Sequence, residues 1–374
     1  MKKGLLFVLL LVSLVGFGQC PTDDLYITTQ AEIDTFASNY PNCTQLTESL
    51  TIRGNDIVNL LGLSQLEDFG GGLIIDNTNI ENFLGLENIQ NLSSSLIIIY
   101  NYNLTSFEGL QNLETIAGQF ALDANNEIMD FTGLNSLSSI GDGSNLGALI
   151  VNNDNLISLQ GLESLIQIHG SFRVEMNDSL ENFNGLQNLE FINGWIGIGE
   201  NEMLIDLGGL DNLLYCMDYL SITENPKLTS ISSLENLDSS ELIGVIIEDN
   251  ILLADCAIAP VCDAIFSPNV NVTINNNFNG CSSVPEVEAQ CQLSISEDDF
   301  SKDISIFPNP LSSILNIEIS QNISFVKATV YSTIGKLILE TSEKQINLEI
   351  LSAGIYFVEV VTDKGNITKK IVKE

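Results

Sequence analysis

Few residues in this chain have the types and spacing that chemistry on a ligand requires. His169 is the only histidine among 374 residues, so a Ser-His-Asp or Cys-His arrangement would depend on it alone. It directly precedes Gly170, which predicts a solvated turn position, and a site with several zinc-binding histidines is excluded by the same count. Hydrolysis of a glycoside needs only two carboxylates. We therefore expect no enzymatic activity, with a carboxylate-dependent polysaccharide hydrolase as an alternative.

Acidic residues recur at equivalent places along the chain. Asp154, Asp178 and Glu202 each directly follow an asparagine that recurs about every 24 residues. Stacked carboxylates favour a hard cation such as calcium, but the sequence has no compact Asp-x-Asp-x-Asp-Gly loop. We predict no dedicated metal or cofactor site, and these three residues are the candidates if calcium binds. A structural surface-layer component that self-associates through calcium is a second alternative.

Two aromatic residues and one cation form the candidate ligand-binding set. The alternation of apolar and polar residues around Arg173 places it on the outer side of a strand, and the equivalent outer positions downstream hold Trp195 and Tyr219. Aromatic rings beside a cation are typical of surfaces that bind sugars or proteins. Gly197 and Gly199 are expected to keep the floor of this surface open.

These residues are positioned by a unit of about 24 residues that repeats eight times between Leu50 and Leu253. Each copy carries a Gly-Leu step and, further on, an asparagine. The steps begin at Gly62, Gly85, Gly109, Gly133, Gly161, Gly185 and Gly209, with Ser233 in the eighth copy. The asparagines are Asn77, Asn101, Asn125, Asn153, Asn177, Asn201, Asn225 and Asn250. A fixed period of this length predicts a solenoid, in which each coil buries its apolar face against its neighbours.

Two periods alternate within one coil. In residues 157–180, apolar residues first recur every three positions, which fits an extended or 3₁₀-like side, and then every two, which indicates a strand. The recurrent asparagine is expected to turn inward at a corner and to bond the backbone of adjacent coils. Outward apolar residues at Ile97, Ile99, Leu149 and Val151 predict a partner or a covering segment, and the insertion at 141–145 is a loop that would supply such a cover.

The repeat is similar to two known families. In the leucine-rich repeat the asparagine lies in Leu-x-Leu-x-x-Asn-x-Leu, whereas here the spacing is Val174-x-x-Asn177-x-x-Leu180, with one extra residue after the asparagine. This departure, the Gly-Leu steps and the flanking cysteines resemble more closely the receptor L domain, over about residues 20–292. The resemblance implies an all-β, right-handed single-stranded β-helix that acts as a non-catalytic binding module, mostly for proteins.

The N-terminus resembles a secretory signal peptide. Residues 1–18 contain two lysines, an apolar run of about 13 residues and small residues at Gly16 and Gly18 before a plausible cleavage site. The run is shorter than the roughly 20 residues that a membrane-spanning helix needs. No later segment is long and apolar enough to span a membrane.

Seven cysteines in an exported chain indicate disulfides that cap the two ends of the solenoid. We predict a pair Cys20–Cys43 in an N-terminal cap, residues 20–49. Four cysteines in a C-terminal cap, residues 254–292, permit three pairings, of which we favour Cys256–Cys281 with Cys262–Cys291. The remaining Cys216 lies inside a coil and is expected to be a buried small hydrophobic residue.

The last 70 residues have a different pattern. After an acidic linker at 293–303, residues 304–374 show alternating strands separated by turns, which predicts a small antiparallel, immunoglobulin-like β-sandwich. This tail resembles the type A C-terminal sorting domain of the type IX secretion system of Bacteroidetes. The motif residues that carry the resemblance are Phe307, Pro308, Asn309, Pro310, Gly335, Gly354, Lys369 and Lys370.

Charge limits the classes of partner. The chain has 13 Lys and Arg against 49 Asp and Glu, and its net charge is −36. Between residues 20 and 292 the only basic residues are Arg53, Arg173 and Lys227. Such a surface repels nucleic acid and anionic lipid. We therefore predict a secreted or outer-membrane-attached recognition or adhesion protein, exported through the periplasm by the type IX machinery, that binds an extracellular protein or glycan.

Overall fold

The computed structural model describes residues 20–143, 147–292, 304–320, 323–333, 335–363 and 366–374. The predicted signal peptide (1–18) and linker (293–303) lie outside these residues. The chain divides into two compact units, Met1–Val287 and Glu288–Glu374, so the division falls just before the predicted linker.

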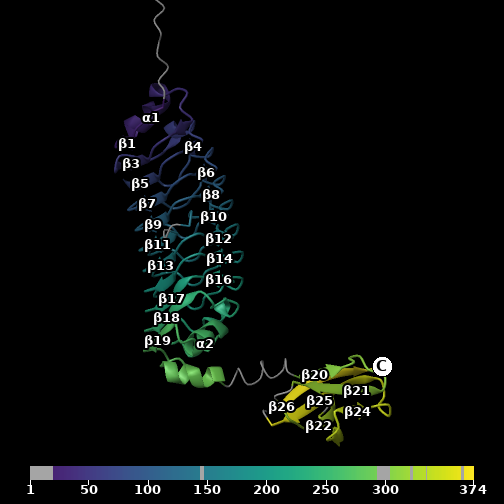
Figure 1. Cartoon of the computed structure of the whole chain (residues 1–374). Helices are drawn as coiled ribbons and strands as arrows, with labels where there is room; N and C mark the ends of the chain where they lie inside the picture. Colours follow the sequence, from purple (N-terminus) through teal and green to yellow (C-terminus); the bar gives the residue numbers. More distant parts are fainter. Residues whose placement is uncertain (1–19, 144–146, 293–303, 321–322, 334, 364–365) are drawn as a thin grey trace, which may run out of the picture. The chain divides into compact units, whose positions relative to one another are not determined.

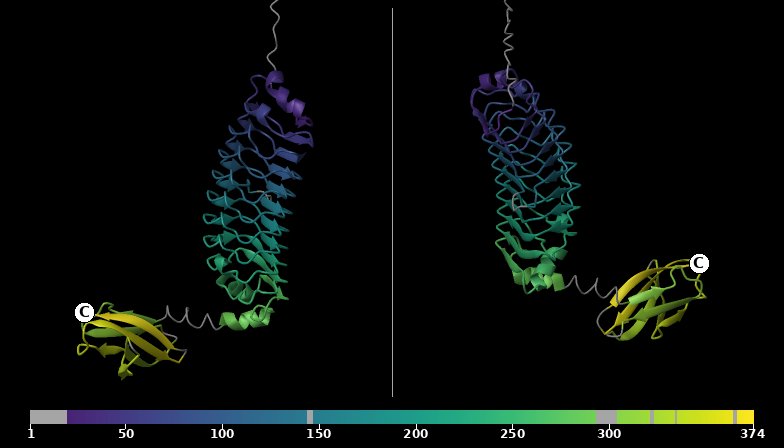
Figure 2. Two further views of the ribbon diagram at one scale, coloured as in Figure 1. Left: turned by 180° about the vertical axis from the view of Figure 1, so that it is seen from behind. Right: turned by 45° about the horizontal axis from the view of Figure 1, so that its top comes forward.

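The first unit is a β-solenoid of stacked coils with two parallel sheets (Figures 1 and 2). The eleven-stranded sheet contains, in order, β1 (Leu25–Ile27), β3 (Leu50–Gly54), β5 (Leu73–Thr78), β7 (Leu96–Ile99), β9 (Phe120–Asp123), β11 (Ala148–Val151), β13 (Phe172–Glu175), β15 (Ile196–Gly199), β17 (Asp218–Thr223), β18 (Leu242–Glu248) and β19 (Asn271–Asn275). The eight-stranded sheet contains β2 (Gln45–Leu46), β4 (Asp68–Phe69), β6 (Asn91–Leu92), β8 (Thr115–Ile116), β10 (Ser139–Ile140), β12 (Gln167–Ile168), β14 (Phe191–Ile192) and β16 (Tyr215–Cys216). Eight of the coils thus contribute one longer and one shorter strand, and β1, β18 and β19 have no counterpart in the eight-stranded sheet.

The third side of each coil carries the apolar residues spaced by three. Consecutive tight turns form there, because Leu86 N donates to Phe83 O at 3.0 Å and Ile89 N donates to Leu86 O at 3.2 Å. Two of these turns are 3₁₀-helices, η1 (Leu61–Leu63) and η2 (Ser232–Leu234). The predicted 3₁₀-like side is therefore confirmed.

Apolar side chains from equivalent positions stack along the inside of the solenoid. The rings of Phe83, Phe107 and Phe131, on three consecutive coils, lie nearly parallel with centroids 5.8 and 5.3 Å apart. All three are fully buried. Stacking of identical residues gives the coils one common register, because each ring packs against the rings directly above and below it.

A ladder of buried asparagines runs along one corner of the solenoid, as predicted. In Asn177, Nδ2 donates to Ile150 O at 2.9 Å and to Glu175 O at 3.0 Å, and Oδ1 accepts from Asn153 N at 3.1 Å. The bond to a carbonyl of the preceding coil recurs at Asn101, Asn125, Asn153, Asn201, Asn225 and Asn250, all of them fully buried. Each amide therefore satisfies backbone groups on the preceding coil, and at most positions on its own coil as well.

The prediction that Asn77 belongs to this ladder is wrong by one residue. Thr78 occupies the ladder position, where its N and Oγ1 donate to Asn101 Oδ1 at 3.0 and 2.7 Å. Asn77 lies just before it with φ 53°, a left-handed conformation that asparagine tolerates well. At the other end Asn277 extends the ladder, because its Oδ1 accepts from Asn250 N at 2.9 Å.

The glycine of the Gly-Leu step is required by backbone contact between coils. Gly185 has φ +115°, and a Cβ at this position would collide with the carbonyl oxygen of Leu159 on the preceding coil. The glycines of the second to seventh copies share this conformation, with φ between +106° and +115°. Ser233 lies in η2, where φ is not positive, which explains why serine is accepted there.

Both ends of the solenoid are capped. Helix α1 (Gln30–Asn39) begins at a capping box, in which Thr29 and Glu32 satisfy each other's backbone N–H, and it buries Ile33 and Phe36. At the other end lies helix α2 (Ala259–Phe266).

The cysteines follow the predicted division between the caps and the coils. Disulfides join Cys20 to Cys43 and Cys256 to Cys281, as predicted. Cys262 and Cys291 are also disulfide-bonded, which agrees with the favoured third pair. Cys216 is a free, buried thiol whose pKa is raised to about 12, chiefly by burial.

The second unit is a small antiparallel β domain. One sheet contains β20 (Ile304–Phe307), β21 (Ile314–Ile319) and β24 (Gln345–Asn347). The other contains β23 (Leu337–Thr341), β22 (Phe325–Ser332), β25 (Gly354–Thr362) and β26 (Asn366–Lys373). Leu315 and Ile317 from the first sheet and Val330 and Val358 from the second belong to one buried cluster. Two sheets that share a core agree with the predicted sandwich.

The asparagine ladder gives a first prediction. Asn177→Ala is expected to lower the free energy of unfolding by about 2 kcal/mol, because it leaves the N–H of Asn153 and the carbonyl of Ile150 without their partners. Asn177→Asp is expected to cost more, since a carboxylate would face two carbonyl oxygens. Urea unfolding followed by the emission of the only tryptophan, Trp195, measures both. The exposed Asn155→Ala is the control, and an equal loss there would contradict the ladder's role.

The coil glycines give a second prediction. Gly185→Ala is expected to destabilise the solenoid by about 3 kcal/mol, because the new Cβ meets backbone and the positive φ is strained. Ser233→Ala occupies the same place in the eighth copy without either problem and is expected to change the unfolding midpoint little. Similar midpoints for the two variants would show that the coils separate enough to accept a side chain.

Candidate binding face

The outer face of the eleven-stranded sheet carries the predicted ligand-binding residues. Strand pairing aligns Phe172 with Ile196 and Leu220, so Trp195 and Tyr219, each one residue earlier, lie side by side in one row across the sheet. Arg173 lies in the next row, opposite Gly197. The prediction that Trp195 and Tyr219 occupy adjacent coils with Arg173 one coil away is therefore confirmed.

Arg173, Trp195 and Glu175 form one connected group. The guanidinium carbon of Arg173 lies 5.2 Å from the centroid of the Trp195 ring, within the range of a cation–π contact. Nε and Nη2 of Arg173 donate to the two carboxylate oxygens of Glu175 at 3.0 and 2.5 Å. This bidentate pair holds the guanidinium plane in one orientation.

The floor beneath these residues is covered, contrary to the expectation that Gly197 and Gly199 leave it open. Both glycines are buried. A Cβ at Gly197 would lie 3.2 Å from Glu175 Oε1 and 3.5 Å from Trp195 Cζ3, and one at Gly199 would lie 3.1 Å from Thr223 Oγ1. The missing side chains thus make room for larger neighbours to lie against the sheet.

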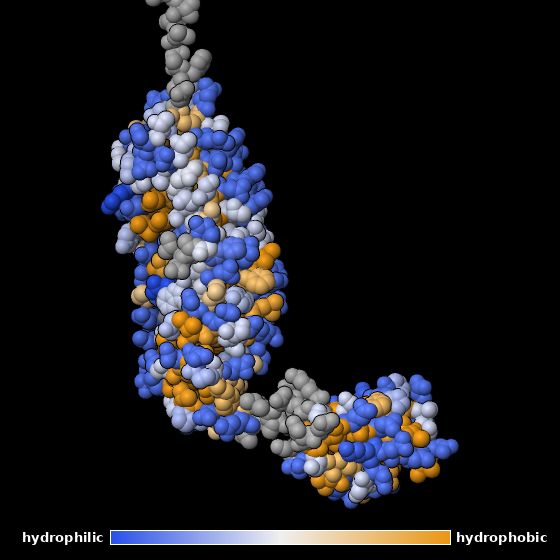
Figure 3. Space-filling model, in the orientation of Figure 1, coloured by the Kyte–Doolittle hydropathy of each residue, from blue (hydrophilic) through white to orange (hydrophobic). Residues whose placement is uncertain are grey.

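The predicted apolar stripe lies on the same face, further toward the N-terminus. Ile97 aligns with Ala121, Leu149 and Arg173 across the sheet, and Val151 with Glu175. Ile97 and Leu149 are half-buried, whereas Val151 is only 7 % exposed. Residues 144–146 of the inserted loop lie outside the described residues. Figure 3 shows that apolar surface on the solenoid gathers in patches between hydrophilic regions.

The weak calcium candidates are not brought together as a site. Asp154, Asp178 and Glu202 are exposed at the corner that follows the asparagine ladder, and Asp154 Oδ2 accepts from Asn126 Nδ2 at 2.6 Å. Within the described ranges, no three His, Cys, Asp or Glu side chains lie close enough together to hold a metal ion. His169 lies at a corner, with Nδ1 3.2 Å from Asn193 Nδ2.

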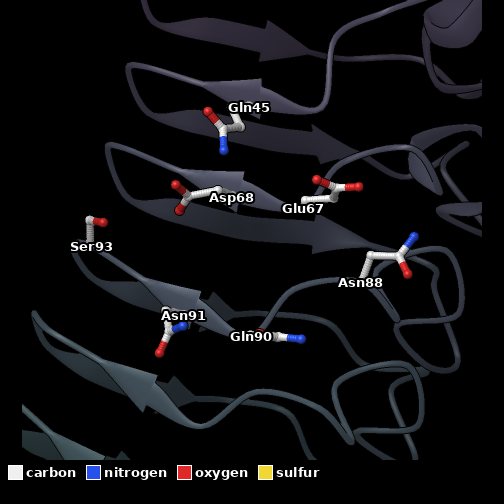
Figure 4. Close-up of a pocket in the computed structure, with 7 residues that line it drawn as sticks. All are labelled: Gln45, Glu67, Asp68, Asn88, Gln90, Asn91 and Ser93. Atoms are coloured by element: carbon white, nitrogen blue, oxygen red, sulfur yellow. The ribbon is translucent and has the colours of Figure 1, made fainter.

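A polar hollow of about 450 Å³ lies over the outer side of the eight-stranded sheet (Figure 4). It is lined by Gln45, Glu67, Asp68, Asn88, Gln90, Asn91 and Ser93. Several of these side chains already join the coils, because Asn88 Nδ2 donates to Ser64 O at 2.8 Å and Asn91 Oδ1 accepts from Thr115 Oγ1 at 2.6 Å. The hollow is thus part of the surface that stacks the coils, and it contains no aromatic ring.

The sequence pattern did not single out two further outward aromatic residues. Phe191 and Tyr215 pair with each other on β14 and β16 and face outward, because Ile192 and Cys216 beside them are buried. They lie on the same two coils as Trp195 and Tyr219, on the other sheet. Alignment of the short strands would have found them, since polar residues occupy the equivalent position from Gln45 to Gln167.

The motif residues of the tail have local structural roles. Asn309 Nδ2 donates to Lys370 O at 2.9 Å and its Oδ1 accepts from Val372 N at 2.8 Å, so this side chain ties the motif to β26. The bonds that precede Pro308 and Pro310 are cis. Lys369 Nζ donates to Ile304 O at 2.9 Å.

The two motif glycines differ in how much their position demands glycine. Gly335 has φ +76°, and its N donates to Ser332 O at 2.9 Å in the turn between β22 and β23. Nothing at Gly354 explains a requirement for glycine, because the nearest atom to an added Cβ would be 3.9 Å away.

The Arg173 stack gives a third prediction. Arg173→Ala is expected to lower the free energy of unfolding by about 1 kcal/mol and to increase acrylamide quenching of Trp195, because the guanidinium no longer covers one face of the ring. Arg53→Ala is the control, since Arg53 pairs with Asp76 at 3.3 Å and has no aromatic partner. Unchanged quenching in Arg173→Ala would mean that the two side chains do not stack in solution.

Comparison with known proteins identifies the tail. Residues 305–374 match the secretion system C-terminal sorting domain. No curated protein matches the chain. Among the described residues, no helix is long and apolar enough to cross a membrane. The second unit of this chain is therefore a C-terminal sorting domain, which points to secretion through the type IX system and to interaction with its machinery.

Proposed function

We propose that this protein is a non-catalytic recognition or adhesion protein, exported through the periplasm, that binds an extracellular protein or glycan. The solenoid is the binding domain, and the tail directs the protein to the secretion system. The observation that carries the proposal is the outer face of the eleven-stranded sheet, where Arg173, Trp195 and Tyr219 gather on consecutive coils. A rigid sheet that presents clustered planar side chains is suited to recognition, because its side chains lose little freedom on binding.

The resemblance of the repeat to receptor L domains supports a binding module rather than an enzyme. The only histidine, on which a Ser-His-Asp or Cys-His arrangement would depend, lies at a coil corner with Nδ1 3.2 Å from Asn193 Nδ2. The acidic surface further limits the partners to neutral or basic molecules.

A localisation experiment tests the export half of the proposal. In a bacterium that has a type IX system, the full-length protein is expected in the medium or on the cell surface. Deletion of residues 305–374 is expected to retain the protein inside the cell, because it removes the whole matched sorting domain. Asn309→Ala, which removes the contacts to β26, is a milder companion variant. Unchanged export of the deletion variant would contradict the role of the tail.

A binding experiment tests the recognition half. The purified secreted protein is incubated with extracellular polysaccharides and with a panel of extracellular proteins, and both retention and release of reducing ends are measured. Retention without turnover supports recognition. Release of reducing ends would replace it by a carboxylate-dependent hydrolase, and calcium-dependent oligomerisation without retention would favour a structural surface-layer component.

A further inference from the structure

The planar side chains on the outer face lie against the sheet instead of standing away from it. The Tyr219 ring occupies the space directly above Gly244, where a Cβ would collide with ring atoms Cδ1 and Cε1. Strand pairing places Gly244 opposite Tyr219 on the next coil. Trp195 packs more loosely beside Gly197 on its own strand, where Cζ3 would be 3.5 Å from an added Cβ, which is van der Waals distance. Both rings are half-buried.

The Arg173 guanidinium, one coil before Trp195 and in the neighbouring row, adds a third planar group beside these rings. Since neighbouring strands in a sheet are about 4.8 Å apart, the guanidinium, the indole and the phenol cover about 10 Å along the solenoid axis. The guanidinium is held by its bidentate bonds to Glu175, and its side chain is 39 % exposed. We call Arg173, Trp195 and Tyr219, with the glycines beneath them, the planar platform.

The chemistry around the planar platform selects its ligand. Sugar rings present a flat C–H face that stacks on aromatic rings, and their hydroxyl groups bond to charged and hydroxyl side chains at the edge of the stack. Glu175, Ser221 and Thr223 line this edge on β13 and β17. The solenoid has only three basic residues and many carboxylates. Its negative charge repels an anionic polymer, so an uncharged ligand is favoured.

The dimensions favour a glycan over a protein. A stable protein partner buries about 800 Å² on each side and anchors large side chains in pockets. The planar platform consists of three flat groups on consecutive coils, and small residues, Gly199, Ser221 and Thr223, are its neighbours in the strand register. A polymer chain laid along the axis contacts every planar group in turn.

We propose that the planar platform binds an uncharged polysaccharide, with consecutive sugar rings stacked on Trp195 and Tyr219 and their hydroxyls bonded to the Arg173–Glu175 pair. This inference rests on the proposed recognition function and names the ligand class for it. Binding needs no covalent step, and the guanidinium N–H groups that do not contact Glu175 donate to sugar oxygens.

The test uses the full secreted chain and affinity electrophoresis in gels that contain hydroxyethylcellulose, xyloglucan or laminarin, with alginate as the anionic comparison. At least one neutral polysaccharide is expected to retard the protein and to change the Trp195 emission, and alginate is not. Trp195→Ala and Tyr219→Ala are each expected to weaken binding about tenfold, as loss of one stacking ring does. Trp195→Phe keeps a ring and is expected to retain part of the affinity.

Phe191→Ala is the matched control, because Phe191 is an exposed aromatic residue on the same coil but on the other sheet. Circular dichroism of each variant checks that it folds. Equal retardation of Trp195→Ala, Phe191→Ala and the parent protein would overturn the planar platform while leaving polysaccharide recognition in place. Retention by an extracellular protein and by none of the neutral polysaccharides would also overturn it, and would leave the proposed recognition function intact.

Discussion

The solenoid depends on satisfying the backbone at one buried corner of every coil. A chain that turns inside a protein leaves N–H and C=O groups without water, and each unpaired group costs stability. The asparagine ladder solves this with one side chain per coil, since its amide donates to two carbonyls and its oxygen accepts from the preceding ladder residue. Because every amide serves neighbouring coils, the bonds also set the stacking register. Coils of this kind are stable together and not singly.

The packing requirements inside the solenoid do not restrict the residues on its outer surface. Phenylalanines, asparagines and Gly-Leu steps occupy the positions where coils meet, and a change at any of them affects two neighbours. Outward positions contact only their own sheet, so charge can accumulate there without breaking the stack. This explains how a unit so rich in carboxylates holds together: its cohesion comes from apolar stacking and backbone bonding rather than from ion pairs.

The two units of the chain differ in strand direction and in the sequence separation of the residues that contact each other. In the solenoid, neighbours in space are about one coil apart in sequence, and the strands are parallel. In the sorting domain the strands are antiparallel, and its ends are joined by long-range contacts such as the Asn309 bonds to β26. The C-terminal strand is thus fixed by a motif more than 60 residues earlier. A domain closed in this way presents a defined structure for recognition regardless of which protein precedes it.

The sequence by itself determined the coil period, the two kinds of side in each coil, the inward asparagines and the separation of cap cysteines from Cys216. These follow from local rules, because inward and outward positions alternate with fixed periods and every buried polar group needs a partner. The outward placement of Arg173, Trp195 and Tyr219 was predictable for the same reason, and alignment of the short strands would also have found the outward pair Phe191 and Tyr215. Only the tertiary structure decided that Thr78 heads the ladder, that Gly197 is covered, and that the Tyr219 ring lies on Gly244. Those outcomes depend on side-chain rotamers and on the exact register between coils, which arise from contacts between residues about 24 positions apart and leave no trace in a local pattern.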